Sequence, residues 1–224
     1  MRQLTALASV VGLTLVVAIS LGCVRWDNKD QIQGSGVART DQRDVEKFEE
    51  LSLMGGMDAV VTIGDQQSVT IEADDNVLPI IETKVEDGKL IVVPTENYRA
   101  KTPVKLTITV RQLKGVAING SGDVDVNGLN GASSFAVAIN GSGDVTAKGT
   151  ADAVSVAVRG SGDVKLQDLQ AKNGKVAVAG SGDVTVNATD KLDVSVAGSG
   201  DVKYMGSPKI TKSIAGSGSV RKVG

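Results

Sequence analysis

The stretch Gly120-Ser121-Gly122-Asp123-Val124 decides the fold, because near-copies of it recur along the second half of the chain. Further copies begin at Gly141, Gly160, Gly180, Gly198 and, with serine in place of aspartate, at Gly216. The steps between successive copies are 21, 19, 20, 18 and 18 residues. A glycine turn that recurs at this interval, between stretches of alternating β-branched residues, is typical of a chain wound into stacked coils.

The residues that flank the copies indicate which side chains form the core. Isoleucine or valine stands two residues before every copy, at Ile118, Ile139, Val158, Val178, Val196 and Ile214. Valine stands four residues after each first glycine, at Val124, Val145, Val164, Val184, Val202 and Val220. A third apolar row, broken in the last copy by Lys212, consists of Val116, Val137, Val156, Val176 and Val194. Small residues alternate with these rows and should face outward, at Ala117, Ala138, Ala157, Ala177, Ser195 and Ser213.

Apolar residues at every second position predict β-strands. Because the same residue type recurs in each coil, like side chains should stack on like at the spacing of paired strands, about 4.8 Å. Glycine lets the backbone turn through conformations that are closed to other residues. The sequence therefore predicts an all-β, single-domain parallel β-helix, a solenoid whose Gly-Ser-Gly-Asp-Val turns lie 18–21 residues apart.

Composition agrees with a thin aliphatic core. The chain has 224 residues, which is the length of one domain, and a solenoid needs only a narrow core. Its aromatic residues are few for a globular enzyme: Trp26, Phe48, Tyr98, Phe135 and Tyr204. The net charge of −2 gives no reason to expect a nucleic-acid partner or a polybasic membrane contact.

Residues 46–110 are less repetitive but keep a β pattern. Short strands are predicted at 58–63 and 68–72, and Asp87-Gly88 is the signal for a hairpin within 85–93. A brief helix is predicted up to Ile81, capped by Asp75 or Asn76. We interpret this part as the irregular first coils and the N-terminal cap of the same solenoid.

The N-terminus has the pattern of an export signal. Arg2 is followed by an apolar, uncharged stretch over residues 4–21, and Leu21-Gly22 leads into Cys23, the single cysteine. This resembles a bacterial lipobox, in which the cysteine is lipidated, although Ser20 and Leu21 depart from the usual residues. A cleaved signal peptide or an uncleaved membrane anchor are the alternatives. Lipidation best explains a lone cysteine in an exported chain.

These features divide the chain into three segments. Residues 1–22 are predicted to be the signal peptide, 23–44 the lipidated Cys23 and a polar tether, and 45–224 the β-helix domain. Val24 after the cysteine resembles a signal for outer-membrane sorting in a Gram-negative cell. The expected location is therefore the bacterial envelope, as an outer-membrane lipoprotein held by its N-terminal lipid.

Several segments together resemble the head GIN domain family, whose members are described as auto-transporter adhesins. They are residues 48–53, 58–64, 76–81 and 86–90, followed by the Gly-Ser-Gly-Asp-Val array with its Ile-Asn-Gly tripeptides at 118–120 and 139–141. The resemblance implies a right-handed β-helix related in shape to pectin lyases and exposed at the bacterial surface. It brings no catalytic residues.

A row of aspartates is the clearest candidate site: Asp123, Asp144, Asp163, Asp183 and Asp201. Stacked in register, neighbouring carboxylates would lie roughly 5 Å apart. The favoured interpretation is structural, with each Asp accepting backbone N–H bonds within its own turn. The alternative is a calcium ladder, because calcium prefers oxygen ligands. No cofactor is expected apart from that possible ion.

Signals of catalysis are weak. The chain has no histidine, so the repeated serines lack the usual general base. The Gly-Ser-Gly-Asp turns lack the helix and lysine of phosphate-binding loops. Arg159 is the one cation in a row of asparagine and alanine, which makes it the first residue to inspect for a specific contact.

Three function classes remain. The leading one is a non-enzymatic surface module that binds a glycan or protein partner. The second is a polysaccharide-active enzyme of pectin-lyase shape, which the missing histidine disfavours. The third is a purely structural envelope protein. The oligomeric state and the identity of the partner do not follow from the sequence.

Overall fold

The computed structural model describes residues 31–224, which form one compact unit with a single continuous core. The predicted signal peptide and Cys23 lie outside the described residues. Within the described part, no helix is long and apolar enough to cross a membrane. Because residues 31–224 form a compact unit with a core of their own, we expect this fragment to fold without the first 30 residues.

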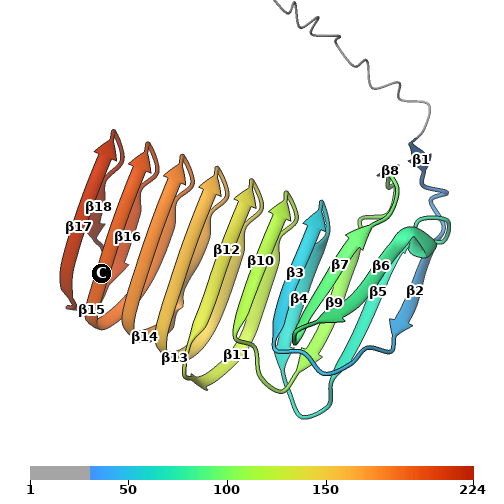
Figure 1. Ribbon diagram of the computed structural model, residues 1–224, viewed down its shortest axis with the longest axis horizontal. Coiled ribbons are helices and arrows are strands. Elements are labelled where there is room, and N and C mark those ends of the chain that lie inside the picture. Colours follow the sequence, from blue (N-terminus) through green and yellow to red (C-terminus); the bar gives the residue numbers. More distant parts are fainter. Residues whose placement is uncertain (1–30) are drawn as a thin grey trace, which may run out of the picture. The chain divides into compact units, whose positions relative to one another are not determined.

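The unit is a β-solenoid with two sheet faces (Figure 1). The face that leads into the glycine turns carries the small outward residues, and we call it the alanine face. Its strands, in spatial order, are β6 (Ile81–Glu86), β7 (Lys89–Pro94), β3 (Glu50–Gly55), β10 (Gly115–Gly120) and β12 (Phe135–Gly141). It continues through the second halves of β13 (Val145–Gly160), β14 (Val164–Gly180) and β15 (Val184–Gly198) to β17 (Lys209–Gly216).

The opposite face begins after each glycine turn. Its strands, in spatial order, are β2 (Ala38–Arg43), β5 (Ser68–Asp74), β9 (Lys105–Val110), β4 (Asp58–Ile63) and β11 (Val124–Ala132). The first halves of β13, β14 and β15 follow, and then β16 (Val202–Met205) and β18 (Val220–Lys222). A separate small pair joins β1 (Ile32–Gln33) to β8 (Tyr98–Arg99).

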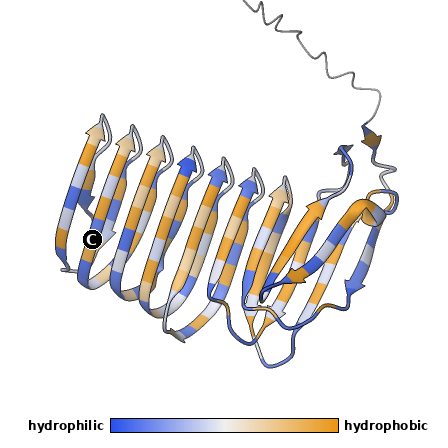
Figure 2. Ribbon diagram, in the orientation of Figure 1, coloured by the Kyte–Doolittle hydropathy of each residue, from blue (hydrophilic) through white to orange (hydrophobic). Residues whose placement is uncertain are grey.

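The register confirms the stacking of like on like. Val158 aligns with Ile139 on one side and Val178 on the other, and all three are buried. Hydrophobic and hydrophilic residues alternate along the strands (Figure 2), so one set lies between the faces and the other faces out. The small row is at least partly exposed, as at Ala157 and Ala177. The predicted parallel coils are confirmed, and so are the inward and outward rows up to the last coil, where Ile214, predicted to be inward, is exposed because no further coil covers it in the described structure.

The first half is part of the same solenoid, as predicted, but its strands are not laid down in spatial order. The coil β3–β4 lies between the coil formed by β7 and β9 and the coil formed by β10 and β11. Beyond β7 and β9 the pairing becomes antiparallel, through β6 on one face and β5 and β2 on the other. The Asp87-Gly88 hairpin is confirmed, with φ of 51° and 74° at the two residues.

Two expectations for the first half differ from the structure. Residues 31–44, expected to be tether, contain β1 and β2 and belong to the compact unit. The expected short helix is a three-residue 3-10 helix, η2 (Leu78–Ile80), without a side-chain cap. Asp75 and Asn76 bond Ser35 instead: Asp75 accepts its hydroxyl at 2.5 Å and Asn76 accepts its N–H at 2.9 Å. These contacts hold the N-terminal segment at Ser35. Because Ser35 is far from residues 75 and 76 in the sequence, rules for helix capping, which consider only neighbouring residues, do not predict them.

Candidate functional site

The two edges of the flattened solenoid are built on different principles. We call the edge formed by the Gly-Ser-Gly-Asp segments the tight edge, and the edge where each coil returns to the alanine face the variable edge. Gly160 has φ of 131°, and a Cβ there would overlap the backbone of Gly141 in the preceding coil. A Cβ on Gly162 would likewise overlap the carbonyl oxygen of Gly143. Both glycines of the motif are therefore required by the close approach of successive turns.

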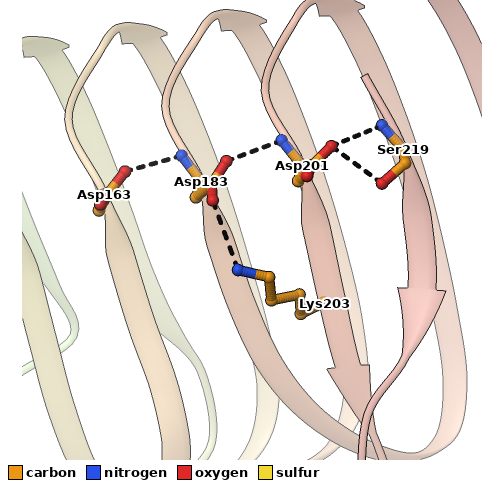
Figure 3. A network of polar contacts seen from close by, with 5 residues as sticks. All are labelled: Asp163, Asp183, Asp201, Lys203 and Ser219. Carbon is orange, nitrogen blue, oxygen red and sulfur yellow. Dashed lines mark hydrogen bonds and ion pairs between the residues drawn. The ribbon is translucent and has the colours of Figure 1, made fainter. Parts of the chain in front are cut away.

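The aspartates of the tight edge form a continuous hydrogen-bonded ladder. Asp163 donates its backbone N–H to Oδ1 of Asp144 at 2.9 Å, and Asp183 does the same to Asp163 at 2.8 Å. Figure 3 shows the ladder running on from Asp163 and ending at Ser219, whose N–H and hydroxyl both reach Oδ1 of Asp201 at 2.9 Å. We expected each carboxylate to bond amides of its own turn. The bonded amide comes instead from the next coil, because the coils stack closely enough for a short side chain to span them.

Asp58 is the first member of this ladder, and sequence reasoning missed it. It accepts the N–H of Asp123 at 3.0 Å, and Gly55 aligns with Gly120. Gly55-Gly56-Met57-Asp58-Ala59 is thus a degenerate copy of the motif. Met57 replaces the second glycine of the motif, at its third position, and is fully buried. The signal that could have found this copy is the glycine three residues before an aspartate that opens an alternating strand.

Lysine ammonium groups form ion pairs with the second carboxylate oxygen, Oδ2, of alternate aspartates. Lys165 lies 2.9 Å from Oδ2 of Asp144, and Lys203 lies 3.5 Å from Oδ2 of Asp183 (Figure 3). Burial opposes ionisation of Asp144, but the Lys165 hydrogen bond and the Asp163 amide outweigh it and lower the pKa of the carboxyl. The Ser219 hydroxyl and amide lower the pKa of Asp201. In Asp144 and Asp201 these donors therefore stabilise the ionised carboxylate.

Within residues 31–224, no group of three or more His, Cys, Asp or Glu side chains is placed to hold a metal ion. The ladder has one carboxylate for each turn, and one oxygen of each carboxylate already accepts an amide of the next coil. Calcium requires six to eight oxygen ligands. The ladder aspartates alone do not supply that number to one point.

The variable edge absorbs the differences in repeat length. The register shifts between neighbouring coils all fall there, between Val126 and Ala132, between Thr146 and Gly149, and between Leu166 and Asn173. This is why the steps between the glycine motifs range from 18 to 21 residues while the motifs themselves stay aligned. Side chains along this edge consequently differ from coil to coil.

Hollows follow the variable edge. An open hollow of about 610 Å³ is lined by the buried Phe48 and Val110. Its other lining residues are polar or carry charges of both signs: Lys47, Glu49, Asp65, Gln66, Gln67, Arg111 and Gln112. A second, of about 280 Å³, shares Arg111 and Gln112. Nε of Arg111 donates to the carbonyl oxygen of Asp65 at 2.6 Å, which fixes the guanidinium between the two hollows.

Sequence reasoning did not identify Arg111 or Gln112, because the hollow brings together residues 47–49, 65–67 and 110–112 from three strand ends. The residue that it did single out, Arg159, is exposed on the alanine face. Arg159 aligns there with Asn140, whose amide donates to Asn119 at 3.0 Å. The serines of the motif are exposed along the tight edge, as at Ser161 and Ser181.

Asp74 is the one buried carboxylate among the described residues, with 0% of its surface exposed. Burial opposes its ionisation, but hydrogen bonds from the amides of Lys101, Thr102 and Gly36 outweigh burial and lower its pKa. The Oδ atoms lie 2.7 Å from the Lys101 N and 2.9 Å from the Gly36 N. The side chain ties residues 34–36 and 101–102 to β5, which is a structural role.

Comparisons with known proteins agree with this architecture. The family model described as "Putative auto-transporter adhesin, head GIN domain" matches residues 47–208. A crystal structure of a "putative adhesin" from Bacteroides fragilis is 27% identical, with a TM-score of 0.70, and the match covers 86% of this chain and 100% of that one. A "putative lipid binding protein" from Parabacteroides distasonis is 26% identical, with a TM-score of 0.50 over 87% of this chain and 100% of that one.

The search of curated proteins gave no match. The family match spans most of the irregular first half as well as the repeats, from just before β3 to the residue before β17. The chain therefore belongs to the head GIN domain family.

Proposed function

We propose that the protein is a non-enzymatic envelope lipoprotein that binds a partner along its variable edge. The observation that carries this proposal is the difference between the edges. The tight edge repeats the same residues in each coil, because the close approach of the backbones requires them. The variable edge presents a different set of side chains in each coil. Recognition needs non-equivalent groups at fixed positions, and loops on a rigid scaffold supply them.

The hollow around Arg111 favours an acidic glycan as the partner. A planar guanidinium matches a carboxylate or sulfate in a bidentate manner, and the amides of Gln66 and Gln112 can bond sugar hydroxyls. Phe48 and Val110 line the hollow but are buried, so its polar side chains would make most of the contacts with a sugar. The adhesin descriptions of the family and of the Bacteroides fragilis relative support a binding role.

A polysaccharide-active enzyme is the alternative. It requires an acid and a base close to one sugar position. The aspartates of the ladder do not fit that role, because their oxygens already bond amides and lysines on the tight edge. Asp65 and Glu49 also line the hollow, so product formation is the measurement that separates the two functions.

A glycan array probed with labelled fragment 31–224 tests the proposal. We expect saturable binding to glycans that carry carboxylate or sulfate groups, with no shortened or unsaturated product. Arg111→Ala should weaken binding at least about tenfold, because a charge-assisted pair contributes about 1.5–3 kcal/mol. Arg159→Ala, an equal loss of charge on the alanine face, is the matched control. Equal loss in both variants, or no glycan bound, would refute the assignment of the hollow.

We also propose that Cys23 carries the lipid that anchors the protein in the envelope. Doubly or triply acylated cysteine anchors stably, whereas one chain does not. The native protein should enter the detergent phase of a detergent partition, with an acylated N-terminal peptide that begins at Cys23. Cys23→Ser should abolish acylation. Unmodified wild-type protein in the aqueous phase, cleaved at another site, would leave an ordinary secreted β-helix.

A further inference from the structure

The two ends of the solenoid differ in how their outermost strands pair (Figure 1). At the N-terminal end, antiparallel strands close the core, and the edge strand β2 carries an internal ion pair of 3.0 Å between Arg43 and Asp41. At the C-terminal end, β17 and β18 each pair with one neighbour only. Ile214 of β17 is 40% exposed, although its row is buried in every earlier coil.

The last coil is strongly cationic. Residues 202–224 contain five basic residues and no acidic one: Lys203, Lys209, Lys212, Arg221 and Lys222. The whole chain has a net charge of −2, so the remaining residues together have −7. The positive charge is thus concentrated at one end of a molecule that is otherwise acidic.

Two of these cations stand in rows that form the core elsewhere. Lys212 aligns with Val194, and Lys222 aligns with Tyr204, which itself aligns with the buried Val186. A further coil stacked in register would bury both ammonium groups without a partner, at high cost. Lysines at such positions are one means by which sheet edges avoid pairing with other sheets.

Four cations of the last coil have no carboxylate within ion-pair distance among residues 31–224, namely Lys209, Lys212, Arg221 and Lys222. Nζ of Lys222 donates to the Ser207 hydroxyl at 3.2 Å. Partly or fully exposed aliphatic side chains lie on the same strands, at Ile210, Ile214 and Val220. We call these four cations and three aliphatic residues the cationic end face.

We propose that the cationic end face docks on an anionic lipid surface. Interfacial binding combines buried apolar area with attraction of lysine and arginine to anionic headgroups, and both elements are present on this one end. The unpaired N–H groups along the outer edges of β17 and β18 can donate to phosphate oxygens. A second copy docked end to end would bring like charges together and bury Lys212 and Lys222. A soluble anionic polymer would match the charge but would leave the exposed side chain of Ile214 without an apolar contact.

The cationic end face lies away from the start of the described chain. The first described strand, β1, pairs with β8 at the opposite end of the solenoid (Figure 1). The cationic end face and the first strand of the described chain therefore lie at opposite ends of the solenoid. The inference does not depend on the glycan site, because it concerns different residues at a different place.

Vesicle co-sedimentation of fragment 31–224 tests the proposal. We expect sedimentation with vesicles of phosphatidylcholine containing phosphatidylglycerol, none with pure phosphatidylcholine, and release by high salt. Near a surface each lysine contributes about fivefold to partition, so Lys209→Gln, Lys212→Gln and Lys222→Gln together should lower it on the order of 100-fold. The matched control replaces Lys105, Lys148 and Lys175 with Gln, an equal loss of charge on exposed lysines away from the last coil.

The control should retain most of the binding, because at 0.1 M salt charges farther than about 10 Å from the surface are screened. Ile214→Ser should weaken binding several-fold without changing its salt dependence. Equal loss in both triple variants, or failure to bind anionic vesicles, would overturn the proposal. Binding of dextran sulfate as tight as that of vesicles, unaffected by Ile214→Ser, would overturn it in favour of an anionic polymer.

Discussion

At both the tight edge and the variable edge the chain turns from one sheet face to the other, but the two edges do so in different ways. At the tight edge, glycines let one turn approach the next, and an aspartate from each coil accepts the amide of its neighbour. At the variable edge, the coils return with different lengths and shifted registers. The first edge therefore determines the stacking, which leaves the second free to vary. Substitutions should be tolerated very differently at the two edges.

The largest effect is expected where the core rows approach the tight edge. Val158 is 1% exposed and stacks between Ile139 and Val178. Val158→Asp buries an unpaired charge and should destabilise the domain by more than about 4 kcal/mol. Ala157→Asp, on the outward row, should cost less than about 1 kcal/mol. Urea unfolding of both variants measures this, and a larger loss for Ala157→Asp would reverse the inward and outward assignment.

A methyl group at a tight-edge glycine should have the next largest effect. Gly162→Ala places a Cβ against the Gly143 carbonyl, and overpacking of this kind costs about 1–3 kcal/mol. Gly131 on the variable edge has φ of 62°, but a Cβ there meets no atom within 4 Å. Gly131→Ala should therefore cost about 1 kcal/mol, from backbone strain alone. If chemical denaturation gave equal losses, close approach of the turns would not be the reason for the glycines.

Loss of one ladder carboxylate should cost about 1 kcal/mol, because the amide of Asp183 loses its acceptor but stays within reach of water. Asp163→Ala is the test variant, and Asp163→Asn should restore most of the stability, since its amide oxygen can still accept. Asp168→Ala, an exposed aspartate beyond the tight edge, is the control. An Asp163→Ala variant that is no less stable than Asp168→Ala would show that the ladder contributes no stability.

Acid should weaken the tight edge by a smaller amount. The pKa of Asp144 and that of Asp201 lie below the ordinary value of 3.8 in the folded protein. Their contribution is therefore complete above that value and is lost as the pH falls through the folded pKa values. The double variant Asp144→Asn, Asp201→Asn should show a shallower fall of Tm below pH 4 than the wild type. Parallel pH profiles would contradict the role of these two carboxylates.

Calcium should have the smallest effect. One oxygen of each ladder aspartate is already bonded to an amide, so millimolar calcium or a chelator should leave the Tm of fragment 31–224 unchanged. A site that binds calcium in the folded state alone would raise Tm with ion concentration. A rise of several degrees that disappears in the triple variant Asp144→Asn, Asp163→Asn, Asp183→Asn would establish a calcium ladder.

The repeated half of the fold was predictable because each row could be compared across six copies. A single valine at position 158 says little, but a row of Ile and Val two residues before every glycine motif indicates one side of a strand. The inward and outward rows and the register followed from that comparison. The ladder residues were also predictable as a row, although their bonding across coils depends on how closely the turns approach.

The rest was not predictable for two physical reasons. The cap depends on contacts between residues far apart in sequence, such as Asp74 with the Lys101 amide, and no local pattern reports them. The hollow around Arg111 exists because three chain segments end side by side, and each of them reads as an ordinary polar loop. The place of Asp58 in the ladder was not predicted, because its copy of the motif retains only one of the two glycines that face the neighbouring turn.

The place of the β3–β4 coil has a consequence for how the chain is assembled. This coil is synthesised directly after β1 and β2 and before any other coil, yet its neighbours on either side are residues 89–110 and 115–132. The edge that faces β7 and β9 therefore stays open until residues 89–110 have emerged, and the edge that faces β10 and β11 until more than 50 residues beyond Ile63 have emerged. Open edges invite pairing with other chains. During export the vulnerable interval ends only when β10 and β11 arrive, after which every new coil leaves a single growing edge.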